Sequence, residues 1–167
     1  MKSRARLLGH PVHQMIIVFP LGLLATSLVF DIVHVLGGSA TMAEVAYWLV
    51  TAGLIGGLLA APFGFIDWMA IPHGTRARRV GAWHGLGNVV VLAFFAASWW
   101  LRRDGDLSQP PLAALGCSFA GAGMALVTAW LGGELVDRLG VGVDPGAHVD
   151  APSSLRTEDA TAPASAR

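Results

Sequence analysis

Long apolar runs separated by short polar segments dominate this chain. A run of about 20 mostly apolar residues can cross a hydrocarbon core of ~30 Å as a helix. Four runs meet that length, and the segments that join them are short. Short connections make neighbouring helices antiparallel. The pattern therefore predicts an all-α, integral membrane, up-down four-helix bundle with spans at Gln14–Leu36, Val45–Ile66, His84–Leu101 and Leu112–Leu131.

The C-terminal residues have a different composition. From Asp144 onward the chain is mostly Ala, Pro, Ser and Thr with scattered charges. Such a segment lacks the apolar surface needed to offset the entropy lost on folding. We therefore expect a transmembrane domain at residues 1–143 and a disordered cytoplasmic tail at residues 144–167.

Composition supports a membrane location. The chain is 54% hydrophobic and 13% charged, whereas soluble domains carry about 25% charged residues. The first apolar run is too long for a signal-peptide core of ~7–15 residues, so it should remain as an anchor. A net charge of zero offers no basic excess for nucleic acid. The expected partner is the lipid bilayer.

Basic residues predict the orientation, because loops on the cytoplasmic side carry an excess of Lys and Arg. One end of the predicted bundle has only Arg102 and Arg103. The other end has the termini and the loop between the second and third spans. We expect that end to be cytoplasmic, because it carries Lys2, Arg4, Arg6, Arg76, Arg78, Arg79 and Arg138.

Residues of metal-ligand type gather at the same predicted end. Two precede or open the first span, and one lies at the corresponding end of each other span. Bundle cores build metal sites from side chains on facing helices, and ionisable groups at membrane depth are costly and commonly functional. The sequence thus predicts one cluster at the cytoplasmic end, formed by His10, His13, Asp67, His84 and Glu134.

Three interpretations of this cluster remain open. The residues could be structural, capping helices and pairing with arginines. They could bind a transition metal such as iron, or a haem b with His13 and His84 as axial ligands. They could relay protons, although the next ionisable residues, Asp31 and His34, lie far away at the other end of the first span. For Asp31 and His34 we expect a structural role, pairing with Arg102 or Arg103 across the outer surface.

Several short motifs resemble one bacterial membrane family, catalogued as domain of unknown function 2231. The resemblance covers nearly all of the chain from Leu7 to Asp144. Its motifs are His10-Pro11-x-His13, Phe19-Pro20-x-Gly22, Asp31, Gly64-x-x-Asp67-Trp68, Arg79-Val80-Gly81-x-x-His84-x-x-x-Asn88, Leu131-Gly132-Gly133-Glu134-Leu135-Val136 and Gly140-Val141-Gly142-Val143.

The resemblance implies a four-span protein of the bacterial inner membrane. Several relatives look to carry His where this chain has Glu134, and Tyr where it has Asp137. This departure weakens any haem assignment that uses position 134, whereas a metal ligand could be either residue type. Some relatives look fused to Rieske iron–sulfur domains, which implies electron traffic and a redox protein partner.

We therefore hypothesise a redox metal site, with non-haem iron or a haem b, that takes part in electron transfer. His13 and His84 are the principal expected ligands, and His10, Asp67 and Glu134 are further ligands or orienting groups. The alternative is a non-enzymatic membrane subunit whose polar residues cap helices and bind a partner. No nucleophile-and-base arrangement and no phosphate loop is present in the sequence, so no catalytic residue is assigned.

Overall fold

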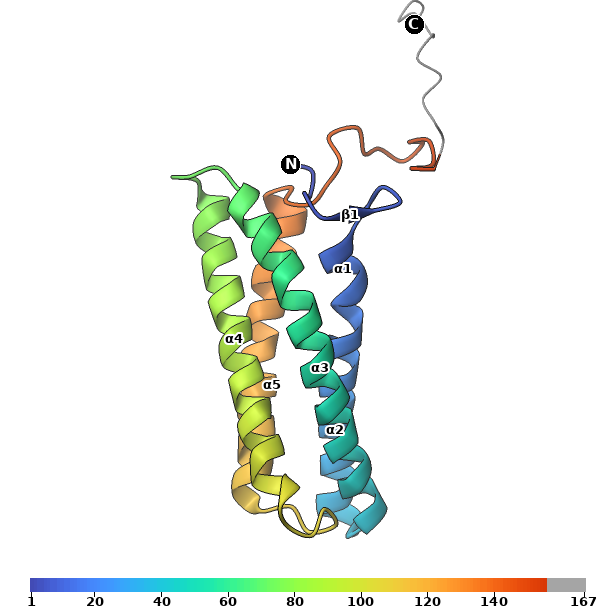
Figure 1. The fold of residues 1–167 in the computed structure, drawn as a ribbon, viewed down its shortest axis with the longest axis vertical. Coiled ribbons are helices and arrows are strands. Elements are labelled where there is room, and N and C mark those ends of the chain that lie inside the picture. Colours follow the sequence, from blue (N-terminus) through green and yellow to red (C-terminus); the bar gives the residue numbers. More distant parts are fainter. Residues whose placement is uncertain (156–167) are drawn as a thin grey trace, which may run out of the picture.

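Four long antiparallel helices make up the computed structural model, which describes residues 1–155 (Figure 1). A short helix opens the first span, a π-helical turn extends the last, and two short strands precede the bundle. This arrangement confirms the predicted all-α bundle. The elements are β1 (Arg6–Leu7), β2 (His10–Pro11), α1 (Val12–Ile16), α2 (Val18–Gly37), α3 (Ala40–Ala70), α4 (Arg76–Arg103), α5 (Leu112–Gly133) and η1 (Glu134–Arg138).

The helices extend beyond the predicted spans. α3 has 31 residues, about 46 Å at 1.5 Å per residue, whereas a hydrocarbon core is ~30 Å thick. Within residues 1–155, four helical segments are long and apolar enough to cross a membrane: Val12–Gly37, Ala40–Ala70, Arg76–Arg103 and Leu112–Arg138. The helices therefore continue past the apolar runs at their ends.

Helix boundaries follow local chemistry. Gly38 ends α2 with a φ of 65°, a left-handed conformation that favours glycine. Thr75 caps α4, and its Oγ1 accepts a hydrogen bond from the backbone N–H of Arg78 (3.2 Å). The first span is interrupted at Ile17, since the ring of Pro20 has no N–H for the carbonyl of Ile16.

The bundle consists of two tightly packed hairpins, α2–α3 and α4–α5. Small residues bring the helices of each hairpin close together, because lipid provides no hydrophobic drive for helix association. A β-carbon added to Gly53 would lie 2.5 Å from Leu24, and one added to Gly121 would lie 3.0 Å from Phe95. The buried core that joins the two hairpins is formed by Leu24, Val50, Val91 and Phe95.

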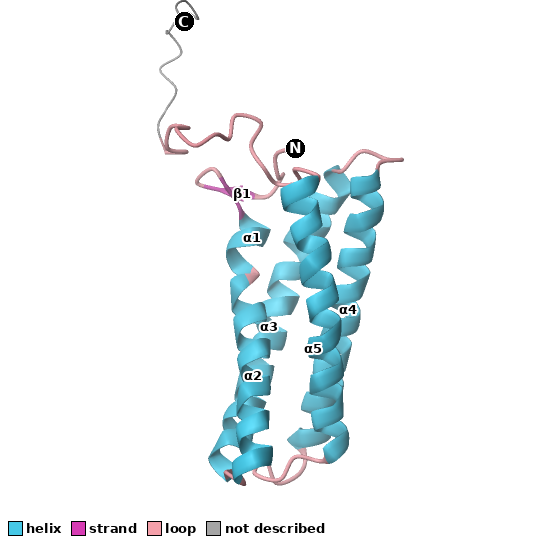
Figure 2. Ribbon diagram, turned by 180° about the vertical axis from the view of Figure 1, so that it is seen from behind, coloured by secondary structure: helices cyan, strands magenta, loops and turns pink. Residues whose placement is uncertain are grey.

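Both views show the N-terminus, the α3–α4 loop and the segment after η1 at one end of the bundle (Figures 1 and 2). We call this the terminal end, and the opposite end, with the α2–α3 and α4–α5 loops, the distal end. The N-terminal ammonium donates a hydrogen bond to the carbonyl of Gly140 (2.6 Å). Asp144 forms ion pairs with Lys2 (3.0 Å) and Arg6 (3.5 Å).

The segment predicted to be a disordered tail is described only in part. Residues 144–155 have no helix or strand. They nevertheless contact the N-terminal segment, since Ser154 Oγ donates to the carbonyl of Leu8 (3.0 Å). Residues 156–167, where the rest of that prediction falls, lie outside the described residues.

Candidate functional site

His13 lies in α1, directly against the backbone of α3. Its Nδ1 is 3.1 Å from the carbonyl oxygen of Ala60. A carbonyl can only accept a hydrogen bond, so Nδ1 carries the proton and Nε2 keeps its lone pair when the ring is neutral. Gly64 makes room for the ring, since a β-carbon there would lie 2.8 Å from Cε1 of His13.

His84 lies in α4 and packs in the same manner against α5. Its Nδ1 is 2.9 Å from the carbonyl oxygen of Thr128, so Nδ1 again carries the proton. A β-carbon added to Gly132 would lie 3.0 Å from Cε1 of His84. Nε2 of His84 accepts a hydrogen bond from the amide of Asn88 (3.2 Å).

The two histidines thus occupy matching positions in the two hairpins. His13 lies in α1, which leads into α2, and His84 lies in the first half of α4. Each donates from Nδ1 to a carbonyl of the second helix of its hairpin and packs on the glycine four residues further along that helix.

Asn88 and Thr128 complete the surroundings of His84. Thr128 Oγ1 donates to Oδ1 of Asn88 (3.1 Å), and Nδ2 of Asn88 also donates to the carbonyl of His84 (2.9 Å). Sequence reasoning did not assign these two residues a role. The four-residue spacing of His84 and Asn88 places them on one helix face and could have pointed to Asn88. No sequence signal connects Thr128 with His84.

Asp67 lies near the end of α3, where it binds the N-terminal segment. Its carboxylate accepts hydrogen bonds from Ser3 Oγ (2.7 and 2.8 Å) and from the backbone N–H groups of Arg4 (2.9 Å) and Ala5 (3.4 Å). Ser3 is buried by this contact. Asp67 therefore attaches the chain terminus to the bundle.

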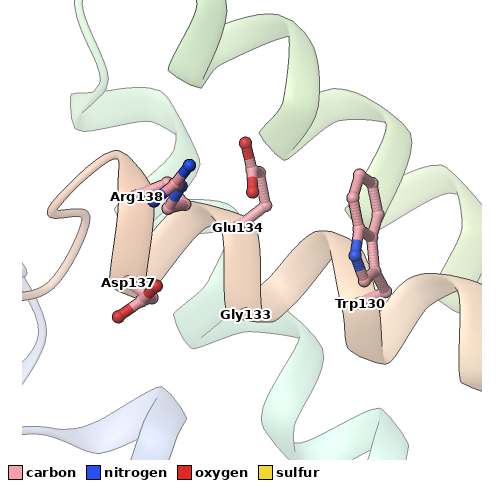
Figure 3. A pocket seen from close by; sticks show the side chains of 5 residues that line it. All are labelled: Trp130, Gly133, Glu134, Asp137 and Arg138. Atoms are coloured by element: carbon pink, nitrogen blue, oxygen red, sulfur yellow. The ribbon is translucent and has the colours of Figure 1, made fainter.

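Glu134 begins η1 and forms an ion pair with Arg76 (2.6 Å). It also lines an open pocket on the outside of the terminal end, together with Trp130, Gly133, Asp137 and Arg138. Figure 3 shows Glu134 and Asp137 pointing to different sides of this helix. The pocket includes none of the other four predicted ligands.

His10 is in β2 rather than at a helix cap. Pro11 is the N-cap of α1, which begins at Val12. The ring of His10 is exposed, and its Nε2 is 3.2 Å from Ser154 Oγ.

The five predicted ligands therefore fall into separate groups. Asp67, Glu134 and His10 each contact nearby polar residues at the terminal end, while His13 and His84 are held by backbone carbonyls. Within residues 1–155, no group of three or more His, Cys, Asp or Glu side chains is placed to hold a metal ion. A metal ion or cofactor bound by both His13 and His84 would therefore be coordinated by only two of the five predicted residues.

The distal end holds a buried ion pair. Nη1 and Nη2 of Arg102 each lie 2.8 Å from a carboxylate oxygen of Asp31, and both side chains are almost fully buried. The expected pairing of Asp31 with Arg102 is thus confirmed, but it lies inside the bundle rather than across the outer surface. The expected pairing of His34 was wrong, since its Nδ1 bonds the carbonyl of Ser39 (2.9 Å).

Comparison with known proteins identifies the family. Neither the curated proteins nor the solved structures give a match. Residues 9–145 match the model of the family described as predicted membrane protein, domain of unknown function 2231. That range includes all four candidate spans and all five residues considered above. The chain is therefore a member of this family of membrane proteins.

Proposed function

We propose that this membrane protein binds one redox metal through Nε2 of His13 and Nε2 of His84 and takes part in electron transfer. One observation carries the proposal: Nδ1 of each ring donates to a backbone carbonyl of the neighbouring helix. Metal-binding histidines usually donate their second ring nitrogen to a carbonyl or carboxylate, which fixes the tautomer and the ring orientation. Nε2 is then the coordinating atom.

The ligand set favours a haem b over non-haem iron. A haem would bring most of its iron's ligands with it, so the imidazoles of His13 and His84 would suffice to hold it. A non-haem site would need further ligands, yet Asp67 is bound by the N-terminal segment and Glu134 by Arg76. Coordination by His84 requires Asn88 to release Nε2. The Asn88 amide keeps its contacts with Thr128 and with the carbonyl of His84.

A second candidate is a non-enzymatic membrane subunit. The contacts of Asp67, Glu134 and His10 favour it, because each has a structural partner at the terminal end. In this case the histidines join helices and the terminal end binds another protein.

For orientation we propose a bacterial inner membrane location with both termini in the cytoplasm. The basic residues support it, since Lys2, Arg4 and Arg6 share the terminal end with the arginines at the start of α4. At the distal end Arg102 pairs with Asp31 and Arg103 pairs with Asp104, so the two arginines there are both neutralised by carboxylates. A redox partner would then approach from the cytoplasm. Reporter fusions at the C-terminus test this orientation.

The binding proposal is tested on the full-length protein, purified in detergent from cells supplied with iron and a haem precursor. We expect a Soret band that shifts on reduction, and one haem per chain by the pyridine haemochrome assay. His13→Ala and His84→Ala should each abolish stoichiometric binding. His73→Ala is the matched control, because His73 is exposed in the α3–α4 loop.

Each outcome separates the candidates. Stoichiometric iron without a Soret band supports non-haem iron. Folded wild-type protein with neither haem nor metal excludes the redox proposal and leaves the structural subunit. Binding that persists in both alanine variants would also contradict it.

A further inference from the structure

The first helices of the two hairpins bury residues at matching positions. Adding 71 to the number of each buried residue of α2 gives a buried residue of α4. The same offset relates His13 to His84. The buried pairs are Pro20 and Val91, Leu24 and Phe95, Ser27 and Ser98, and Asp31 and Arg102.

The second helices match in the same way with an offset of 68. Every described buried residue of α5 has a buried counterpart in α3. The glycine beneath each histidine is also matched, since Gly64 corresponds to Gly132. The buried pairs are Ala46 and Ala114, Tyr47 and Leu115, Val50 and Ser118, Gly53 and Gly121, and Ala60 and Thr128.

Contacts inside the hairpins correspond as well. Gly53 accommodates Leu24 in the first hairpin, and the corresponding Gly121 accommodates the corresponding Phe95 in the second. The bonds from the histidines to Ala60 and Thr128 also join matching positions. Agreement in position, burial and contact partner indicates one packing arrangement used twice.

The matching residues Asp31 and Arg102 meet each other. α2 and α4 are diagonal in the bundle, because each packs against both α3 and α5. If two copies are related by a two-fold axis, a residue can contact its own counterpart only at that axis. The bidentate pair, 2.8 Å at both oxygens, therefore marks where the axis runs.

We propose that the bundle is two copies of one helical hairpin, related by an approximate two-fold axis along its length, and that the Asp31–Arg102 pair is the contact that joins the first copy to the second. Parallel repeats about an axis along the membrane normal are a known way of building membrane proteins. Pairing of either hairpin with another copy of itself would bring two like charges together in a buried position. The ion pair therefore favours association of the first hairpin with the second over association of either hairpin with a copy of itself.

One buried position adapts the second hairpin to its arginine. Ser98 and Ser118 hydrogen bond to each other (2.8 Å), and both accept from the Arg102 guanidinium (3.2 Å each). The first hairpin has the counterpart of Ser98, Ser27, but Val50 stands at the counterpart of Ser118. Exchanging the charges should therefore require exchanging Val50 and Ser118 too.

The test measures the melting temperature of the full-length protein in detergent by circular dichroism. Asp31→Arg and Arg102→Asp alone should each lower Tm by about 10 °C or prevent folding, since breaking a buried pair leaves an uncompensated charge. The charge exchange Asp31→Arg/Arg102→Asp should recover part of that loss. Adding the serine exchange Val50→Ser/Ser118→Val to the charge-exchanged protein should then raise Tm further.

The serine exchange alone, with the native charges, should lower Tm. The serine exchange should thus lower Tm with the native charges and raise it with the exchanged charges. This opposite effect on Tm is expected only if Val50 and Ser118 occupy equivalent positions in the two hairpins. The same sign in both backgrounds would overturn the proposal, as would a charge exchange no more stable than the single variants. The control is Arg103→Asp/Asp104→Arg, which exchanges an exposed ion pair nearby and should leave Tm unchanged.

Discussion

The ring of His13 lies on Gly64, so close that the smallest side chain would displace it. A β-carbon at Gly64 would approach Cε1 of His13 to 2.8 Å and Nδ1 to 3.0 Å. Both contacts are shorter than normal van der Waals separations. The hydrogen bond from His13 to the carbonyl of Ala60 therefore depends on a glycine one helical turn further along α3.

Gly64→Ala should destabilise the protein and lower its content of the proposed cofactor. Overpacking a tight contact costs about 1–3 kcal/mol in the free energy of unfolding, and His13 would shift from the Ala60 carbonyl. Unfolding in mixed detergent micelles measures the first effect. Gly22→Ala is the control, since nothing lies within 4 Å of a β-carbon there, and it should be neutral or stabilising. Equal losses in both variants would contradict a role for the close contact.

Asp67→Asn should release the N-terminal segment from the bundle. The carboxylate accepts from Ser3 Oγ and from two backbone N–H groups, and an amide has only one oxygen to replace it. We expect faster tryptic cleavage after Arg4, followed by mass spectrometry. Asp104→Asn, at an exposed residue of the distal end, is the control. An unchanged cleavage rate would show that the segment is held by other contacts.

Arg78→Lys should weaken the turn between α3 and α4. Nη1 of Arg78 donates to the carbonyls of Trp68 (3.1 Å), Met69 (3.2 Å) and Ile71 (2.8 Å), and the guanidinium lies 4.2 Å from the Trp68 ring centroid. An ammonium lacks the planar group that stacks on the ring while bonding helix-end carbonyls.

The expected cost of Arg78→Lys is about 1–3 kcal/mol in the free energy of unfolding, as for hydrogen bonds from charged groups. Arg79→Lys, on the exposed side of α4, should cost far less. Comparable losses from the two substitutions would rule out the special role of Arg78.

The contact of Asp144 with the N-terminal segment should depend on pH. The N–H of Gly146 and then the Lys2 ammonium hold the pKa of the Asp144 carboxyl below its ordinary value. A carboxyl with a lowered pKa stabilises the folded arrangement above its ordinary pKa, and that contribution disappears as the pH falls through the lowered value. Carboxyl carbon chemical shifts followed by NMR during acid titration should show a midpoint below that of an unpaired aspartate. Lys2→Met should move the midpoint upward, and an unchanged midpoint would mean that the ion pair does not affect it.

The sequence alone determined the number of spans, their order and the end of the bundle at which His13 and His84 lie. This is because a membrane requires about 20 apolar residues per crossing, and short loops require antiparallel neighbours. It could not determine the helix ends, since helices such as Ala40–Ala70 continue beyond the apolar run that predicted the span.

Only the tertiary structure decided which polar groups meet. Successive helical residues point about 100° apart, so a shared depth does not establish a shared face. Arg102 turns inward to Asp31 whereas its neighbour Arg103 bonds Asp104 outside. Likewise Asp67 and Glu134 turn toward Ser3 and Arg76, and His13 and His84 each turn toward a backbone carbonyl. The rotation of each helix about its axis is set by the packing of glycines against large side chains in both hairpins, and that packing depends on residues far apart in the chain.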